Sequence, residues 1–536
     1  MKPIPQPPSR ILTLGACLLA APALTAGTVV NPSNVVSGDT PVGTLLAVDT
    51  PYQGASPSFS IPGPLGPDWP EDTDDGWEMK AGSNLEADHA QSNWEPDGTP
   101  IAEARVYRLN SAPGSSYTFD LPDGAVVFGV YATWATRGTS GSNWGYNEGS
   151  AVNNSLGQNV APSADMVLKW TDAVATERNG NFQKIFTGPI VVTGGDGFTV
   201  TSVRTGNTHQ SDAVVVDYLI PGAYWDTDGT TAGSGGATPS GTWDAATTNW
   251  DLTASDGTGA AAAWSPGATA AFSAGSDATG SYTVTVDGTL DIGGLFFEDG
   301  DPTLAAGTSP ALQIDSDTLL TVLDGNTATI AAPFTETGGS WALKKLGAGS
   351  LVLSGDNSGA TGGAVLEGGI TQFDAPNSIP GTGENLTLNE GGILRFGSSF
   401  VDTNIPAALD RIVPASSGLI VADNYASTNF DLDTPGLASA FFGAIGNVNY
   451  TGTLTPNSAG YRLGGGGGTL TLPAALSPGL PLTTKAPGVT QLNGFSSSVG
   501  SLSGNGDIEN GSGSTAVTLT VNQSTNAAMQ SEDSAV

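Results

Sequence analysis

The chain alternates short apolar runs with glycine, asparagine, aspartate, serine and proline, and helical periodicity is nearly absent. Runs of Val, Leu, Ile and Thr bounded by turn residues predict β-strands. Beyond residue 243 such runs recur at a spacing of about ten residues, which predicts a stacked solenoid. The strands predicted there include Tyr282–Val286, Leu290–Phe297, Leu312–Asp315, Leu319–Leu323, Ala328–Ala331, Leu351–Leu353, Ala364–Leu366, Leu386–Leu388, Ile393–Phe396, Leu419–Ala422, Gly468–Leu472 and Val517–Val521.

The architecture expected for this region is a right-handed parallel β-helix. Each coil buries only an inward stripe of Leu, Val and Ile and bonds to the next coil, so a small set of residue types is reused. Coils of ~20–25 residues stacked at ~4.8 Å predict a rod ~60 Å long. Gly and Asn supply the positive φ angles of tight corners.

Residues 27–222 differ in composition, since they hold six Trp and both His. Their predicted strands are joined by loops of uneven length, which favours a β-sandwich or jelly-roll-like domain over a repeat array. These strands are Ser116–Leu121, Ala125–Trp134, Met166–Trp170, Ile190–Thr193, Phe198–Val203 and Ala213–Ile220.

The first 26 residues read as a secretory signal peptide. Lys2 and Arg10 give a positive start, Ile11–Leu24 is apolar, and small residues precede a cleavage site after Ala26. No later segment approaches the ~20 apolar residues of a membrane helix. We therefore expect a secreted or cell-surface protein with no membrane-spanning segment in the mature chain.

The expected organisation has five parts. After the signal peptide (1–26) and the sandwich domain (27–222), residues 223–242 form a Gly/Ser/Thr-rich linker, or a cap that leads into the solenoid. Residues 243–525 are the β-helical region, and 526–536 a frayed tail. Either the chain is a piece of a longer protein, or the open-ended rod tolerates a polar end.

Charge narrows the range of partners. There are 51 Asp plus Glu against 16 Lys plus Arg, which gives a net charge of −35. Nucleic acid is excluded as an expected partner, because phosphate binding needs clustered cations. The single Cys, Cys17, excludes an intrachain disulfide framework.

One segment carries a family resemblance. Residues 345–353 read KLGAGSLVL and are followed by SGDN, TGG and EGG, which resembles the autotransporter-associated β-strand repeat. The matching positions are Lys345, Gly347, Gly349, Leu351, Leu353, Gly355, Asn357, Gly362, Gly363, Gly368 and Gly369. Residues 485–494 (KAPGVTQLNG) look like a degenerate second copy. The resemblance implies a β-helix like autotransporter passenger regions and transfers no catalytic residue.

A fainter likeness concerns the N-terminal region. Residues 179–186, 197–204 and 211–219 (SDAVVVDYL) are similar to the closing strands of β-sandwich modules found in xanthan lyases and golvesin-like proteins.

Candidate chemistry is sparse. His89 and His209 lie in turn-like stretches without a nucleophile elbow, so exposed loop histidines are the expectation. Carboxylate pairs that could cleave glycosides cannot be picked out among so many acids. Asp72, Asp74 and Asp75 form an acidic loop that offers oxygen ligands to a structural Ca²⁺, against the alternative of a solvated loop. No other cofactor is expected.

Aromatic residues offer a second kind of site. Trp134, Trp144 and Tyr146 bracket a polar loop and could stack on sugar rings, against the alternative that Trp in a sandwich belongs to the core. By contrast, Trp243, Trp250 and Trp264 read as packing that covers the first coil.

The sequence thus predicts an exported bacterial surface or matrix protein with a structural or adhesive role. Its β-helical rod would display a sandwich domain, with a polysaccharide or cell-surface glycan as the expected partner. The alternative is a polysaccharide hydrolase or lyase on the β-helix.

Overall fold

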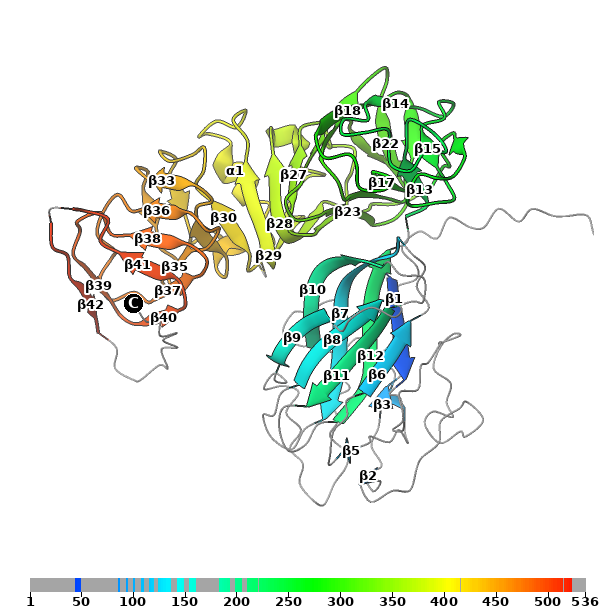
Figure 1. Cartoon of the computed structure of the whole chain (residues 1–536). Helices are drawn as coiled ribbons and strands as arrows, with labels where there is room; N and C mark the ends of the chain where they lie inside the picture. The colour runs from blue at the N-terminus through cyan, green and yellow to red at the C-terminus, as the bar shows by residue number, and fades with distance from the viewer. Residues whose placement is uncertain are drawn as a thin grey trace, which may run out of the picture.

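A computed structural model describes residues 221–522, apart from 415 and 514. Before residue 221 it describes the strands named below together with residues 124, 125 and 192. The described chain is almost entirely β-structure (Figure 1). Residues 1–26, the acidic loop at 71–75, both histidines and the tail at 526–536 lie outside the described residues.

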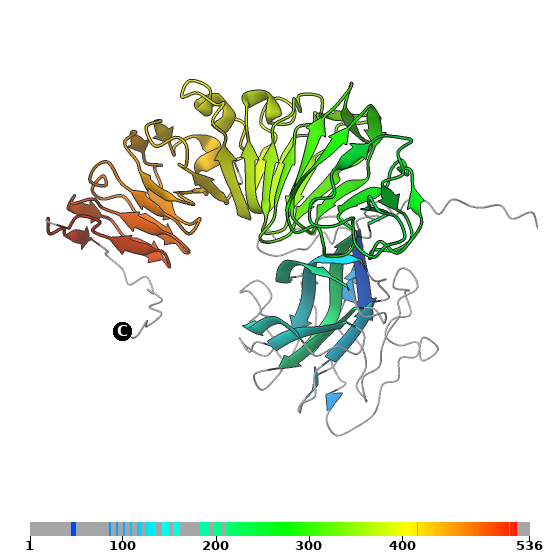
Figure 2. The same ribbon diagram turned by 45° about the horizontal axis from the view of Figure 1, so that its top comes forward.

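The strands before residue 221 form two four-stranded antiparallel sheets, seen in blue to cyan-green in Figures 1 and 2. The first has the order β1 (Thr44–Asp49), β12 (Gln210–Leu219), β7 (Val126–Ala135) and β10 (Gln183–Val191). The second has the order β6 (Ser115–Phe119), β11 (Phe198–Arg204), β8 (Ser142–Glu148) and β9 (Asn154–Val160). Two short pairs complete the set, β2 (Leu85–Glu86) with β5 (Arg108–Leu109) and β3 (Asn93–Trp94) with β4 (Pro100–Ile101). That these sheets together form a β-sandwich domain over residues 27–222 stays a prediction.

A parallel β-solenoid follows, and its most continuous face carries eleven successive rungs. They are β18 (Ser281–Val286), β21 (Asp301–Ala306), β24 (Thr327–Ile330), β27 (Ser350–Leu353), the second halves of β28 (Ala364–Phe373) and β29 (Leu386–Phe396), β30 (Leu419–Val421), β32 (Phe441–Gly443), β35 (Tyr461–Gly464), β37 (Leu482–Lys485) and β40 (Leu502–Gly504). Paired residues are 20 positions apart at Leu482–Leu502 and 26 apart at Ile393–Leu419, so the predicted coil length is confirmed.

The other faces are shorter. One contains β13 (Ala223–Trp225), β17 (Thr269–Phe272), β20 (Gly294–Phe297), β23 (Thr318–Val322), β26 (Leu343–Leu346) and the first halves of β28 and β29. A third contains β19 (Thr289–Asp291), β22 (Ala311–Ile314) and β25 (Phe334–Glu336). Beyond it lie β33 (Asn447–Asn449), β36 (Thr469–Thr471), β38 (Val489–Gln491) and β41 (Asp507–Glu509), with the pairs β31 (Phe430–Asp431)–β34 (Leu454–Thr455) and β39 (Ser497–Val499)–β42 (Leu519–Val521).

Stacking of like residues fills the interior. One inward row runs through consecutive rungs, and every member is at most 1% exposed: Val284, Leu304, Ile330, Leu353, Phe373 and Phe396. Each coil can bury this stripe only against its neighbours, as in other solenoids. The predicted parallel β-solenoid is confirmed. Ten spacings of ~4.8 Å give a rod ~50 Å long, shorter than expected because residues 243–268 do not form a full coil.

Tryptophans cover the first coil. Trp225, Trp243, Trp250 and Trp264 are all at most 5% exposed. The first three pack around Phe272, and Trp264 packs against Trp243 with ring centroids 4.8 Å apart. β14 (Gly241–Trp243), β15 (Trp250–Asp251) and β16 (Ala261–Ala262) supply this cap, which confirms the packing role predicted for three of these residues. Asp277 holds the linker-like loop before β14 in place. Its carboxylate accepts hydrogen bonds from the backbone N–H groups of Ser234 and Gly236, at 2.7 Å each.

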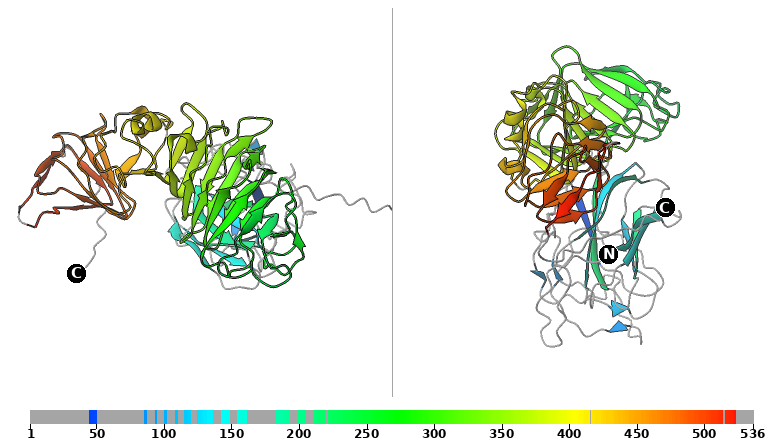
Figure 3. Two further views of the ribbon diagram at one scale, coloured as in Figure 1. Left: turned by 90° about the horizontal axis from the view of Figure 1, so that it is seen from above. Right: turned by 90° about the vertical axis from the view of Figure 1, so that its left-hand side faces the viewer.

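Helical structure is minor within the described ranges. It consists of α1 (Ile405–Leu409) and two short 3₁₀ turns, η2 (Pro376–Ser378) and η3 (Pro435–Leu437). No described helix is long and apolar enough to cross a membrane. Figures 1 and 2 show the solenoid bending between the yellow and orange coils, and the end-on view on the right of Figure 3 looks along it from the C-terminal side.

One strand prediction was wrong in detail. Leu290–Phe297 is not a single strand, because Ile292 and Gly293 turn a corner between β19 and β20. The apolar run is continuous because residues on both sides of an inward corner are buried. Periodicity alone does not reveal that corner.

Candidate functional site

Lys345, the motif lysine, is a structural group inside the solenoid. It lies on β26 and is only 1% exposed. Its ammonium donates to three backbone carbonyls, those of Leu346 and Gly347 at 2.8 Å and of Gly368 at 2.9 Å. Burial lowers the pKa of Lys345 to about 7, whereas the carbonyl oxygens favour its charged form. The side chain therefore joins the corners of two successive coils.

The motif glycines stand where neighbouring coils touch. Gly347 has φ +78°, and a Cβ there would lie 2.1 Å from the carbonyl oxygen of Val322. Gly363 has φ +84°, and its Cβ would lie 2.0 Å from the carbonyl oxygen of Asn385. Backbone of an adjacent segment also lies within 3.4 Å of the Cβ position at Gly349, Gly355, Gly362, Gly368 and Gly369. The glycines of the repeat pattern therefore lie where the backbones of adjacent segments approach too closely for a side chain.

Asn357 takes the place of a strand on the third face. It is fully buried, and its side-chain oxygen accepts from the Phe334 N–H of the preceding coil at 3.0 Å. Its amide nitrogen donates to the Ser378 carbonyl of the following coil at 2.9 Å. Leu351 and Leu353, the remaining motif positions, are core residues of β27.

The degenerate second copy does not reproduce this arrangement. Lys485 ends β37 on the outer surface, where its ammonium lies 3.7 Å from Glu390 Oε1. In register it stands next to Gly464. Its surroundings therefore differ from those of Lys345.

The aromatic residues proposed for sugar contact lie on strands of two different sheets. Trp144 on β8 is completely buried. Tyr146, two residues along the same strand, is half-buried and stacks on Phe198 at 5.3 Å between ring centroids. Trp134 lies on β7. A fully buried indole presents no face to a sugar, so packing accounts for Trp144. Glycan binding by Tyr146 and Trp134 stays a prediction.

No group of three or more His, Cys, Asp or Glu side chains suited to a metal ion occurs within the described ranges. Asp72, Asp74 and Asp75 lie outside them, so Ca²⁺ binding there stays a prediction.

The face that contains β17, β20, β23 and β26 meets the N-terminal sheets through an apolar contact. Val126 of β7 packs with Tyr224 and with the outward-facing Ala271, Phe296, Leu319 and Leu346. At the adjoining corner, burial and the neighbouring Asp299 raise the pKa of Glu298 to about 8. Burial also raises the pKa of Asp299. No sequence pattern marks this carboxyl pair, because acids are common at the turns of the whole chain.

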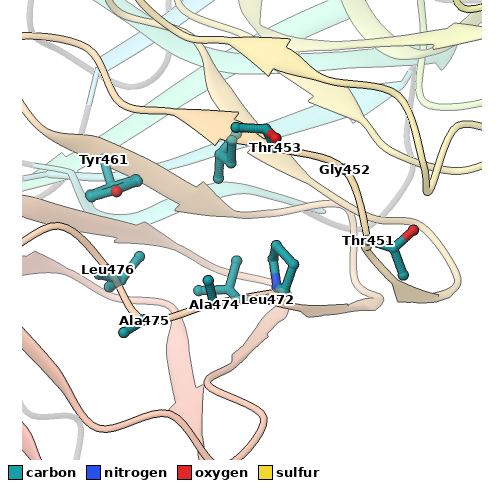
Figure 4. A pocket seen from close by; sticks show the side chains of 10 residues that line it. Thr451, Gly452, Thr453, Tyr461, Leu472, Ala474, Ala475 and Leu476 are labelled. Atoms are coloured by element: carbon teal, nitrogen blue, oxygen red, sulfur yellow. The ribbon is translucent and has the colours of Figure 1, made fainter.

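A pocket of about 290 Å³ opens beside the C-terminal coils (Figure 4). Leu472, Pro473, Leu476 and the Tyr461 ring give it apolar walls, and Thr451 and Thr453 supply hydroxyls. The Tyr461 hydroxyl is already bonded, since it exchanges hydrogen bonds of 3.1 Å with Ser477. The volume is at the small end of the range for ligand sites. No motif marks this pocket.

Comparisons with known proteins give a limited picture. No family profile matches the chain. A stretch of 248 residues, 43% of the chain, is 24% identical to the adhesin BmaC autotransporter of Brucella suis biovar 1 (strain 1330), and the chain spans about 7% of the length of that protein. The catalytic unit of a thermostable GH87 α-1,3-glucanase from Streptomyces thermodiastaticus strain HF3-3 aligns over 80% of this chain and 92% of its own, at 12% identity and a TM-score of 0.15. That score carries no argument about fold or activity.

The suspected likeness to autotransporters is thus supported in its coarser form, by weak similarity to an adhesin and by a β-solenoid. The likeness to xanthan-lyase and golvesin-type modules is unsupported.

Proposed function

We propose that this chain is a bacterial cell-surface adhesion protein whose solenoid is both a rigid stem and a lateral binding surface. The observation that carries the proposal is the solenoid of eleven rungs with apolar inward rows. Two buried polar side chains, Lys345 and Asn357, form hydrogen bonds to backbone groups of neighbouring coils. Such stacking gives a stiff rod with long, regular outer faces. The similarity to an autotransporter adhesin supports this use.

Export by a cleaved signal peptide and binding to a glycan belong to the same proposal. The acidic composition supports a soluble, self-repelling surface, since net charge far from zero opposes self-association. The pocket beside Tyr461 and the half-buried Tyr146 of β8 are two places where a sugar would find apolar area beside polar groups.

The direct test is adhesion. The mature chain, displayed on a non-adherent bacterium by a heterologous anchor, is expected to raise attachment to host cells or to immobilised glycans and matrix proteins. A β-solenoid domain of unrelated sequence on the same anchor is the control. Attachment equal to that control, from a chain shown to be folded by protease resistance, would refute the proposal.

One observation favours a second candidate function, polysaccharide hydrolysis. Burial and the neighbouring Asp299 raise the pKa of Glu298 to about 8, which favours the protonated form that a general acid needs. If the pair is catalytic, the wild-type chain releases reducing ends from a polysaccharide, and Glu298→Gln and Asp299→Asn each abolish the release. Activity that is absent, or that survives both changes, removes this candidate.

A further inference from the structure

The outer side of the eleven-rung face carries a small second core between β29 and β37. Leu419, Val421 and Phe441 are at most 8% exposed and pack with Ile393 and Ile445, apart from the main interior. Their register fixes the arrangement, since Ile393 pairs with Leu419 and Leu419 with Phe441. These residues point outward, so something other than the solenoid interior must cover them.

Cations form part of that cover. The Arg462 guanidinium carbon lies 4.4 Å from the centroid of the Phe441 ring, and the Lys485 ammonium lies 5.2 Å from it. A cation over an aromatic face is attracted by the ring quadrupole, which fixes both charged groups above this surface. The glycine run after β35 covers the neighbouring side, because the Cβ positions of Gly465 and Gly466 lie 3.2 Å from Leu419.

The surface is also curved. The Lys485 ammonium donates to the Glu390 carbonyl at 3.2 Å. Yet β29 and β37 are separated in the ladder by β30, β32 and β35. Four spacings of ~4.8 Å amount to ~19 Å along a straight stack, more than one lysine side chain spans. Figures 1 and 2 show a bend in this part of the solenoid, and the Lys485–Glu390 contact is consistent with it.

The charge on this surface is unusual for the chain. Residues 221–522 contain 27 Asp plus Glu and only six Lys plus Arg. Three of the six have structural partners elsewhere: Lys344 pairs with Asp317, and Lys345 and Arg411 bind carbonyls. The other three, Arg395, Arg462 and Lys485, all lie on this outer surface, which we call the cationic strip.

Two of these cations form no salt bridge within the described residues, although the charge of Glu390 acts on Arg462. They are Arg395 and Arg462, and each has a buried Nε–H without a hydrogen-bond acceptor in the described part of the chain. A buried donor left unpaired costs about 1–3 kcal/mol. The guanidinium fork matches carboxylate and phosphate or sulfate oxygens better than it matches any neutral group.

We propose that the cationic strip binds an acidic polysaccharide, whose sugar carboxylates or sulfates meet Arg395, Arg462 and Lys485. The three cations come from three different coils, on β29, β35 and β37, which favours an extended polyanion over a single small anion. A peptide that binds by strand addition needs an open sheet edge, whereas these strands are paired on both sides.

This inference rests on the proposed adhesive function and names the ligand of one of its surfaces. The test uses the whole mature chain with three probes: polygalacturonate as carboxylate polymer, dextran sulfate as sulfate polymer and uncharged dextran. Calorimetry or biolayer interferometry at low and at physiological salt measures the affinity. The wild-type chain is expected to bind one or both polyanions, more weakly at high salt, and not dextran. Which polymer binds separates carboxylate from sulfate recognition.

Variants locate the site. The double change Arg395→Gln and Arg462→Gln is expected to weaken polyanion binding at least tenfold. Lys344→Gln removes a charge that is already paired to Asp317 on another face and is expected to leave binding unchanged. Glu390→Gln removes the carboxylate beside Lys485 and is expected to strengthen binding, a gain that misfolding cannot produce.

The outcomes are separable. No polyanion binding by the wild-type chain, or equal loss in Lys344→Gln and the double variant, overturns the cationic strip. If that chain still adheres to cells, the proposed function stands without this ligand. Polyanion binding with the expected variant pattern but no adhesion supports the strip and refutes the adhesive function.

Discussion

Replacing Asn357 tests how the third face of the solenoid is held together once its strand ladder stops. The last strand of that ladder is β25, and the next two coils are joined to it through the Asn357 side chain. Asn357→Ala leaves the Phe334 N–H and the Ser378 carbonyl without partners in a dry interior. Each buried unpaired group costs about 1–3 kcal/mol, so we expect the free energy of unfolding to fall by ~3–4 kcal/mol.

Asn357→Asp separates donor loss from cavity formation. Aspartate has the same shape and still accepts from Phe334, but its ionised form has no hydrogen to donate to Ser378 and is buried as a charge. Its native pKa should therefore be raised above the unfolded value. This variant should be most stable at low pH, where the protonated acid can donate, and lose stability as pH rises above ~4.

Native-state hydrogen exchange is the suitable assay, because it reports local opening without requiring a single unfolding transition. We expect the Phe334 amide to exchange ~100-fold faster in Asn357→Ala than in the wild type. Asn447, an exposed residue of β33, provides the control, and Asn447→Ala should change stability by less than ~0.5 kcal/mol. Equal effects of the two alanine variants would refute the bridging role of Asn357.

Three further outcomes are expected. Gly347→Ala should destabilise the chain by ~2 kcal/mol more than Gly338→Ala in denaturant titrations. Both glycines have positive φ (78° and 75°), but only Gly347 faces backbone of the preceding coil, at Val322; equal costs would contradict this. Burial raises the pKa of Glu298 from 4.5 to about 8, so the native state binds more protons than the unfolded state between these pH values, and stability should fall as pH rises through that window. In Glu298→Gln the melting temperature should depend less on pH there. An unchanged slope of melting temperature against pH would refute the role of Glu298. Burial lowers the pKa of Lys345 from 10.5 to about 7, so stability should rise between pH 7 and 10.5. Lys345→Met should lose that rise and be less stable than the wild type at pH 7, because three backbone carbonyls lose their donor. A variant as stable as the wild type would show that the three carbonyls do not need the ammonium.

Local sequence was enough to identify the solenoid. Short Leu, Val and Ile runs between glycines can bury their apolar side only by stacking, and the inward row from Val284 to Phe396 shows that they do. The tryptophan cap was predictable for a similar reason, since an apolar cluster at the start of an array must cover an open end. The corner at Ile292 was not, because both of its sides are buried.

The surfaces that matter for binding were decided by tertiary structure. Arg395, Arg462 and Lys485 are 67 and 23 positions apart in sequence, and stacking of coils, together with the bend near the Lys485–Glu390 contact, places them on one outer face. The pocket beside Tyr461 likewise joins residues from separate coils. The sequence by itself determined the repeating coil, because burial and hydrogen bonding within a coil are local. Which charges meet across coils depends on register and bending, and these exist only in the folded chain.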